Sequence, residues 1–199
     1  MRDVVRDNAY RTVLLSSHAF NVVVDIGAHI GTFAMLWHDK NPNAVIACVE
    51  ACPDNLAALQ RNVGHFATVI HAACTYQTRS VGLLNAVRPH CESTGGSMVV
   101  PLDELDTAPG QPGYRYWRDT RPLPTITLEQ IMDRLGVDYI DLLKLDCEGS
   151  EIDILGHTPS RRRSAASLTR HQQASPIPAG MATRITLQPG TGGQTRLAR

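Results

Sequence analysis

No stretch of this 199-residue chain is apolar over a length that could span a membrane, although 43% of its residues are hydrophobic. The N-terminal residues mix acids with apolar side chains, and they lack the apolar core and cleavage site of a secretory signal peptide. We therefore expect a cytoplasmic protein with no membrane partner. A chain of this length can bury one ordinary core.

Cysteines are few and show no paired spacing. The five lie at positions 48, 52, 74, 91 and 147, without a C-x-x-C motif. This pattern argues against a disulfide framework and against a structural zinc site, so we expect reduced thiols and no metal centre. The carboxylates of Asp146 and Glu148, with no histidine nearby in the sequence, do not by themselves indicate a metal.

Acidic residues are absent after residue 156, where seven arginines occur. Residues 1–156 hold 12 Lys and Arg against 19 Asp and Glu. The segment 157–199 has no lysine and no amphipathic period, and its Ser, Ala, Pro, Gly and Arg content is typical of disordered chains. We predict a folded domain over residues 1–156 and a basic, disordered tail over residues 157–199.

The dinucleotide-binding fingerprint Gly-x-Gly-x-x-Gly is also absent. The apolar run 22–26 carries Asp25 and breaks at Gly27 and Gly31, which predicts a strand, a tight turn and a helix. Gly31 is expected to let the start of this helix pack against the strand. His29 stands where the fingerprint needs a glycine to admit a pyrophosphate, and Asp25 suits a ligand with an ammonium group. This spacing favours S-adenosylmethionine over a nicotinamide dinucleotide.

A second apolar run, over residues 45–49, ends on Glu50. An acid at a strand tip can accept hydrogen bonds from both hydroxyls of a ribose, so the two strand ends together predict a nucleoside site. The alternative is a strand-to-helix turn that binds no ligand, as many α/β proteins have.

Alternating strand and helix patterns predict an α/β fold with a doubly wound, mostly parallel sheet. Helices are expected over residues 4–15, 32–38, 53–63 and 128–135, and strands over 22–26, 45–49, 69–73, 81–84, 98–102 and 139–145. The runs 81–84 and 98–102 are expected to pair antiparallel, and residues 102–124 to be irregular. After residue 155 only residues 184–187 offer a strand pattern, so the sheet is expected to lack its C-terminal strands.

Two further segments carry a resemblance to a known family. Residues 126–131 read ITLEQI and residues 140–151 read IDLLKLDCEGSE. With the turn at 22–31 and Glu50, they resemble the FkbM family of S-adenosylmethionine-dependent methyltransferases. The resemblance implies a Rossmann-like fold, bound S-adenosylmethionine, and methyl transfer to a hydroxyl oxygen of a sugar or natural product. It also implies a C-terminus that is truncated or frameshifted relative to the family.

The same resemblance implies roles for individual residues. The resemblance places Asp25, Gly27 and Gly31 at the methionine part of the cofactor, Glu50 at the ribose, and Ala51 and Ala73 at the adenine. His29 is a further cofactor-site candidate in the same turn, and the alternative is a histidine at a helix start that faces solvent. Asp146 would lie near the reacting methyl, and Glu148 would act as a general base or orient the acceptor. Alternatively, this acidic pair caps the helix that begins near Ser150. Lys144 is interpreted as structural or as an ion-pair partner.

Two other function classes stay open at this point. The chain could be a truncated, non-catalytic protein that binds a nucleoside, or a nicotinamide oxidoreductase, which the glycine spacing disfavours. The expected partner is a small-molecule or glycan acceptor, with no nucleic acid. An unclosed sheet edge would allow a homo-oligomer.

Overall fold

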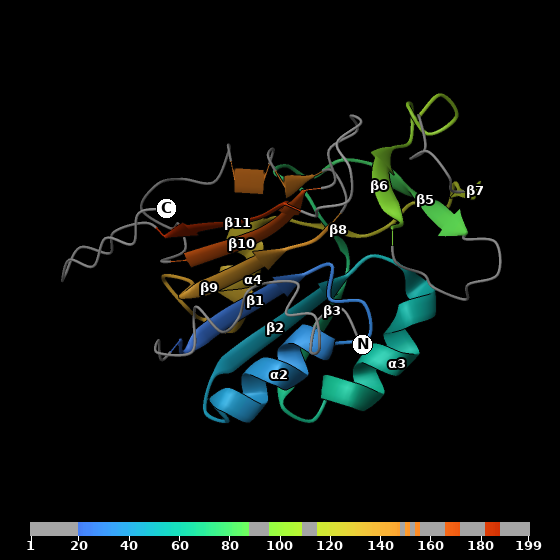
Figure 1. The fold of residues 1–199 in the computed structure, drawn as a ribbon. Coiled ribbons are helices and arrows are strands. Elements are labelled where there is room, and N and C mark those ends of the chain that lie inside the picture. The colour runs from blue at the N-terminus through green and yellow to red at the C-terminus, as the bar shows by residue number, and fades with distance from the viewer. Residues whose placement is uncertain are drawn as a thin grey trace.

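The computed structural model describes residues 20–87, 96–108, 115–147, 150–151, 154–155, 166–171 and 182–187. Six strands form the central sheet: β1 (Val22–Ile26), β2 (Val45–Glu50), β3 (Ala67–His71), β9 (Leu142–Leu145), β10 (Ala166–His171) and β11 (Ala182–Leu187). Their order is β11-β10-β9-β1-β2-β3, as Figure 1 shows. All neighbours pair in parallel except β11, which is antiparallel to β10. The predicted α/β fold with a mostly parallel sheet is confirmed.

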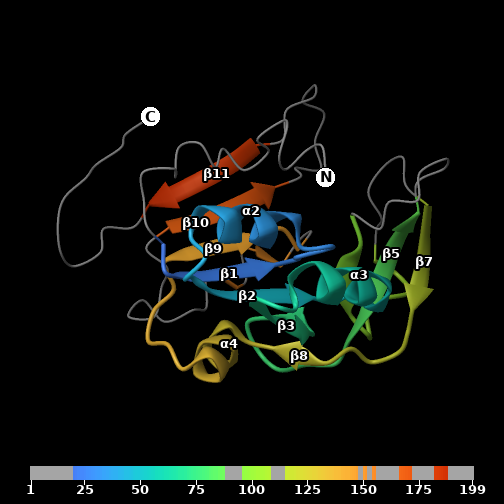
Figure 2. The same ribbon diagram turned by 90° about the horizontal axis from the view of Figure 1, so that it is seen from below.

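Helices cover both faces of this sheet, as expected for a doubly wound fold. Helices α2 (Thr32–Lys40) and α3 (Pro53–Val63) lie on one face and α4 (Leu128–Leu135) on the other (Figure 2). Alternation along β1 explains the two layers, because successive side chains of a strand point to opposite faces. Val23 packs in the cluster that contains Trp37 of α2, whereas Val24 packs in the cluster that contains Met132 of α4.

The start of α4 is fixed by its own sequence. The Thr127 hydroxyl accepts a hydrogen bond from the Gln130 N–H, and the Gln130 side chain accepts one from the Thr127 N–H, at 3.3 and 2.9 Å. This reciprocal pair is a capping box, which satisfies two backbone donors that a helix start leaves without partners. The helix has the predicted bounds, as do α3 and β1.

A smaller antiparallel sheet lies beyond the carboxyl ends of β1 and β2 (Figure 2). Its strands are β5 (Val81–Val87), β6 (Met98–Pro101) and β7 (Arg115–Asp119), in the order β6-β5-β7. The predicted pairing of the first two is confirmed. The expectation that residues 102–124 are wholly irregular is wrong, since β7 lies within them. Its sequence RYWRD has no apolar alternation, and pairing with β5 holds it extended.

The structure also corrects the expectation that the sheet lacks C-terminal strands. Strand β10 continues the sheet beside β9, and β11 closes it in antiparallel pairing. Strand β11 includes residues 184–187, which carried the one strand pattern found there. Backbone pairing at a sheet edge needs no strong apolar period, so these strands carry little local signal of their own. The remainder of 157–199 lies outside the described residues, as does the helix predicted over 4–15.

Other boundaries differ modestly from the prediction. Strand β3 begins at Ala67, and after it Ala73 and Cys74 form a separate short strand, β4 (Ala73–Cys74), paired with β8 (Thr125–Ile126). Within the described ranges, no helix is long and apolar enough to cross a membrane.

Candidate functional site

The turn after β1 lies between the carboxyl ends of β2 and β9, its two neighbours in the sheet. The N–H groups of Gly27 and Ala28 both donate to the Val49 carbonyl of β2, at 2.9 and 3.0 Å. Gly27 has a positive φ of 74°, and a Cβ added to it would lie 2.0 Å from the carbonyl oxygen of Asp146. The fold therefore brings Gly27 beside Asp146, and the close approach requires glycine.

Gly31 has a different neighbour from the one expected. It precedes α2 with a φ of 88°, and an added Cβ would lie 2.6 Å from the Val63 side chain of α3. The sequence suggested that Gly31 lets the helix approach the strand. It instead allows α2 to pack close to α3.

Glu50 connects the turn to the start of α3. Its Oε2 accepts a hydrogen bond from the His29 N–H at 2.7 Å. Its Oε1 accepts from the Cys52 N–H at 2.9 Å and from the Asn55 side-chain amide at 3.0 Å. A carboxylate offers about four acceptor positions, so these contacts leave about one for a ligand. Glu50 is thus held in one orientation at the tip of β2.

His29 adopts a backbone conformation that is uncommon for a residue other than glycine. Its φ is 54°, in the left-handed region, and this directs its N–H to Glu50. Burial lowers the pKa of the His29 imidazole, against the opposing effect of Glu50. This environment therefore favours the neutral form of the ring.

Beneath the turn lies a buried ion pair. Lys144 of β9 is opposite Asp25 of β1 in the sheet, and its Nζ lies 2.8 Å from Asp25 Oδ1. The same ammonium group donates to the Gly27 carbonyl at 2.6 Å. Burial raises the pKa of the Asp25 carboxyl, and the charge of Lys144 opposes this shift. The interpretation of Lys144 as an ion-pair partner is confirmed.

The acidic segment after β9 is only partly described. The Asp146 N–H donates to the Ile26 carbonyl at 3.0 Å, and the Asp146 side chain is half-buried beside the turn. Glu148 lies outside the described residues. The buried Glu151 accepts a hydrogen bond from the Cys147 N–H at 3.0 Å, which closes the loop after the strand. In the described part of the chain, no group of three or more His, Cys, Asp or Glu is arranged to hold a metal ion.

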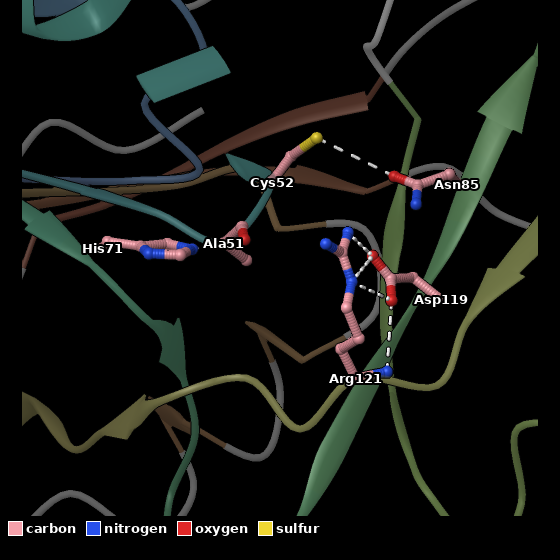
Figure 3. A network of polar contacts seen from close by, with 6 residues as sticks. All are labelled: Ala51, Cys52, His71, Asn85, Asp119 and Arg121. Carbon is pink, nitrogen blue, oxygen red and sulfur yellow. Dashed lines mark hydrogen bonds and ion pairs between the residues drawn. The ribbon is translucent and has the colours of Figure 1, made fainter. Parts of the chain in front are cut away.

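The two predicted adenine contacts are not equivalent. Ala51 is half-buried directly after Glu50, and its carbonyl lies 3.3 Å from Nε2 of His71 (Figure 3). Ala73 is buried in β4, where its N–H donates to the Pro124 carbonyl. Ala51 therefore lies partly exposed just after the carboxyl end of β2, whereas the Ala73 side chain is buried.

Sequence reasoning missed two contributors to the site. Asn55, which bonds Glu50, is an ordinary residue for the first turn of a helix and gave no signal. The second is the contact of Lys144 with the Gly27 turn. A signal for it existed, because a lysine between the leucines of LLKL must be buried with a partner.

Gly27→Ala is expected to lower both stability and affinity for any ligand held by the turn. The positive φ alone costs about 1–2 kcal/mol, and the added Cβ must displace the Asp146 backbone. Gly136→Ala is the matched control, because Gly136 also has a positive φ of 67° but has no atom within 4 Å of its added Cβ. Urea unfolding would compare the two variants. Equal losses would mean that contact with Asp146 is unimportant.

The chain matches one family model, the methyltransferase FkbM domain, over residues 25–174. It is 23% identical over 167 residues to methyltransferase 1 of Beauveria bassiana, covering 77% of this chain and 64% of that protein. It is 27% identical over 174 residues to methyltransferase sdnD of Sordaria araneosa, covering 77% of this chain and 66% of that protein. The chain thus spans about two thirds of the length of these relatives.

Among solved structures, the chain is similar to the FkbM methyltransferase from Methylobacillus flagellatus KT. The TM-score is 0.41 at 18% identity, covering 75% of this chain and 32% of that one. The family match includes the β1 turn, Glu50 and the segment after β9, and it covers most of the chain. The chain therefore belongs to the FkbM methyltransferase domain family.

Proposed function

We propose that this chain transfers a methyl group from S-adenosylmethionine to a hydroxyl oxygen of a small-molecule or glycan acceptor. The observation that carries the proposal is the convergence of Glu50, the Gly27 turn and Asp146 at the carboxyl ends of β2, β1 and β9. Ligands of open α/β sheets bind at this edge. Membership of the FkbM family supports the choice of methyl donor.

In this proposal each part of the donor meets a different strand end. The turn from Gly27 to Gly31, including His29, borders the methionine part. Glu50 accepts a hydrogen bond from one ribose hydroxyl, because about one of its acceptor positions is left. Ala51 borders the adenine. The Ala73 side chain is buried, so the proposal gives it no direct contact with the base.

Asp25 has a supporting role in this arrangement. Its side chain has no exposed surface and is paired with Lys144, so it has no free charge to offer an ammonium group. We propose that it holds Lys144, which in turn holds the carbonyl of Gly27. Asp25 then positions the turn instead of contacting the donor.

Methyl transfer is an in-line displacement at the sulfonium methyl. The acceptor oxygen forms a bond to the methyl carbon as the carbon–sulfur bond breaks, and the sulfur leaves as the thioether of S-adenosylhomocysteine. The hydroxyl proton passes to a carboxylate, for which Asp146 beside the turn and Glu148 are the candidates. Holding donor and acceptor in line supplies much of the rate.

Glu50→Ala is expected to weaken S-adenosylhomocysteine binding by about 1–3 kcal/mol, the usual cost of losing hydrogen bonds to a charged group. Isothermal titration calorimetry would measure the change. Glu104→Ala, at an exposed glutamate outside the site, is the control and should leave the affinity unchanged. Equal affinities of wild type and Glu50→Ala would remove Glu50 from the cofactor site. Preferential binding of NAD over S-adenosylhomocysteine would favour an oxidoreductase instead.

A further inference from the structure

The small sheet meets the central sheet at the tip of β2. The Cys52 thiol, directly before α3, lies 3.7 Å from the side-chain oxygen of Asn85 in β5 (Figure 3). Both residues are buried. This contact holds the paired strands β5 and β7, called the β5–β7 ribbon below, beside the segment that follows Glu50.

The strand register determines which residues of the ribbon face this tip. Leu83 is opposite Asp119, and Asn85 is opposite Trp117. Residues directly opposite in an antiparallel pair project to the same face, as do residues two apart along a strand. Since Asn85 faces Cys52, Asp119 faces the same way.

Asp119 holds an exposed arginine on this face. The Arg121 side chain is 73% exposed and that of Asp119 only 5%. The Arg121 Nε donates to Oδ1 of Asp119 at 2.8 Å, and the Arg121 backbone N–H donates to the same oxygen at 3.1 Å. The hydrogen bonds from Arg121 hold the pKa of Asp119 below its usual value. The negative charge of Asp54, in the first turn of α3, adds to the effect of Asp119 in raising the pKa of the Arg121 guanidinium.

The orientation of this guanidinium relates it to the nucleoside site. In Figure 3 it lies on the side of Asp119 that faces Ala51 and Cys52. The strand order β9-β1-β2-β3 puts Asp146 on one side of β1 and Glu50 on the other. The β5–β7 ribbon contacts the segment that follows β2. In the proposed position of the donor, this segment lies at the end of the donor that is farthest from the methyl group.

We propose that Arg121, held flat by Asp119, stacks on the adenine of the bound donor and sets the affinity for its base. This inference rests on the proposed function. A planar, weakly hydrated guanidinium stacks well on an aromatic face, and Asp119 fixes it before the ligand arrives. The ribbon would then form the outer wall of the base-binding end of the site.

Isothermal titration of the full chain with S-adenosylhomocysteine would test this role. Arg121→Ala is expected to weaken binding about tenfold. Arg121→Lys keeps the charge but not the flat group, so it should not restore affinity. Arg115→Ala is the matched control, because Arg115 is an exposed arginine at the other end of β7, and its loss should change affinity less than about twofold.

The same variants should also be titrated with ligands that represent parts of S-adenosylhomocysteine. Adenosine should show the same relative loss with Arg121→Ala, whereas S-ribosylhomocysteine, which has no base, should show none. A loss equal to that of Arg115→Ala, or an equal loss with S-ribosylhomocysteine, would overturn the assignment of Arg121 and leave the proposed function intact. Absence of S-adenosylhomocysteine binding by the wild-type chain would overturn both.

Discussion

Lys144→Met is expected to lower the free energy of unfolding by about 3–5 kcal/mol, one of the two largest effects that we anticipate for this chain. The substitution leaves Asp25 buried without its counter-charge and leaves the Gly27 carbonyl without its 2.6 Å donor. Urea unfolding would measure the loss. Binding of S-adenosylhomocysteine should weaken as well, because the turn would lose its support.

A second substitution distinguishes a lost ion pair from a lost packing contact. Asp25→Asn combined with Lys144→Met removes the uncompensated charge, so the double variant should be more stable than Lys144→Met alone. Lys40→Met is the matched control, since the other lysine of the chain is exposed and should cost less than about 1 kcal/mol. Additive losses in the double variant would show that Lys144 does not stabilise Asp25 as a charge.

Asp146→Asn is expected to lower kcat for methyl transfer by about 10²–10⁴, because the amide cannot take up the acceptor proton. Its affinity for S-adenosylhomocysteine should change little, since the proposed mechanism places Asp146 on the acceptor side. Transfer of labelled methyl from S-adenosylmethionine to a panel of sugars and hydroxylated small molecules would provide the assay. Glu148→Gln in the same assay would show which carboxylate takes the proton.

The control for this measurement lies at the opposite end of the same strand. Asp138→Asn makes the same chemical change at an exposed position before β9 and should leave kcat unchanged. Unchanged turnover in both Asp146→Asn and Glu148→Gln would exclude these carboxylates as the base. Retained S-adenosylhomocysteine binding with no turnover of any acceptor by the wild-type chain would instead favour a non-catalytic nucleoside-binding protein.

Local signals in the sequence were sufficient for much of the central fold. The apolar run before Gly27 predicted β1 and the turn, and the pattern over residues 53–63 predicted α3. Thr127 and Gln130 mark the capped start of α4. Each of these features depends on residues a few positions apart. The side chain of Glu50 at a strand end likewise indicated a ligand site, because the carboxyl ends of parallel strands share one edge.

The tertiary structure decided what depends on distant partners. Lys144 contacts Gly27 from 117 positions away, and no local pattern specifies that β9 lies beside β1. Strands β7 and β10 lack a clear apolar alternation, so their place depends on backbone pairing with β5 and β9. The position of Arg121 follows from the same register. The sequence thus determined where the chain turns and which residues carry charge, whereas strand pairing decided which of those charges meet, because hydrogen-bonded register is a non-local property of the sheet.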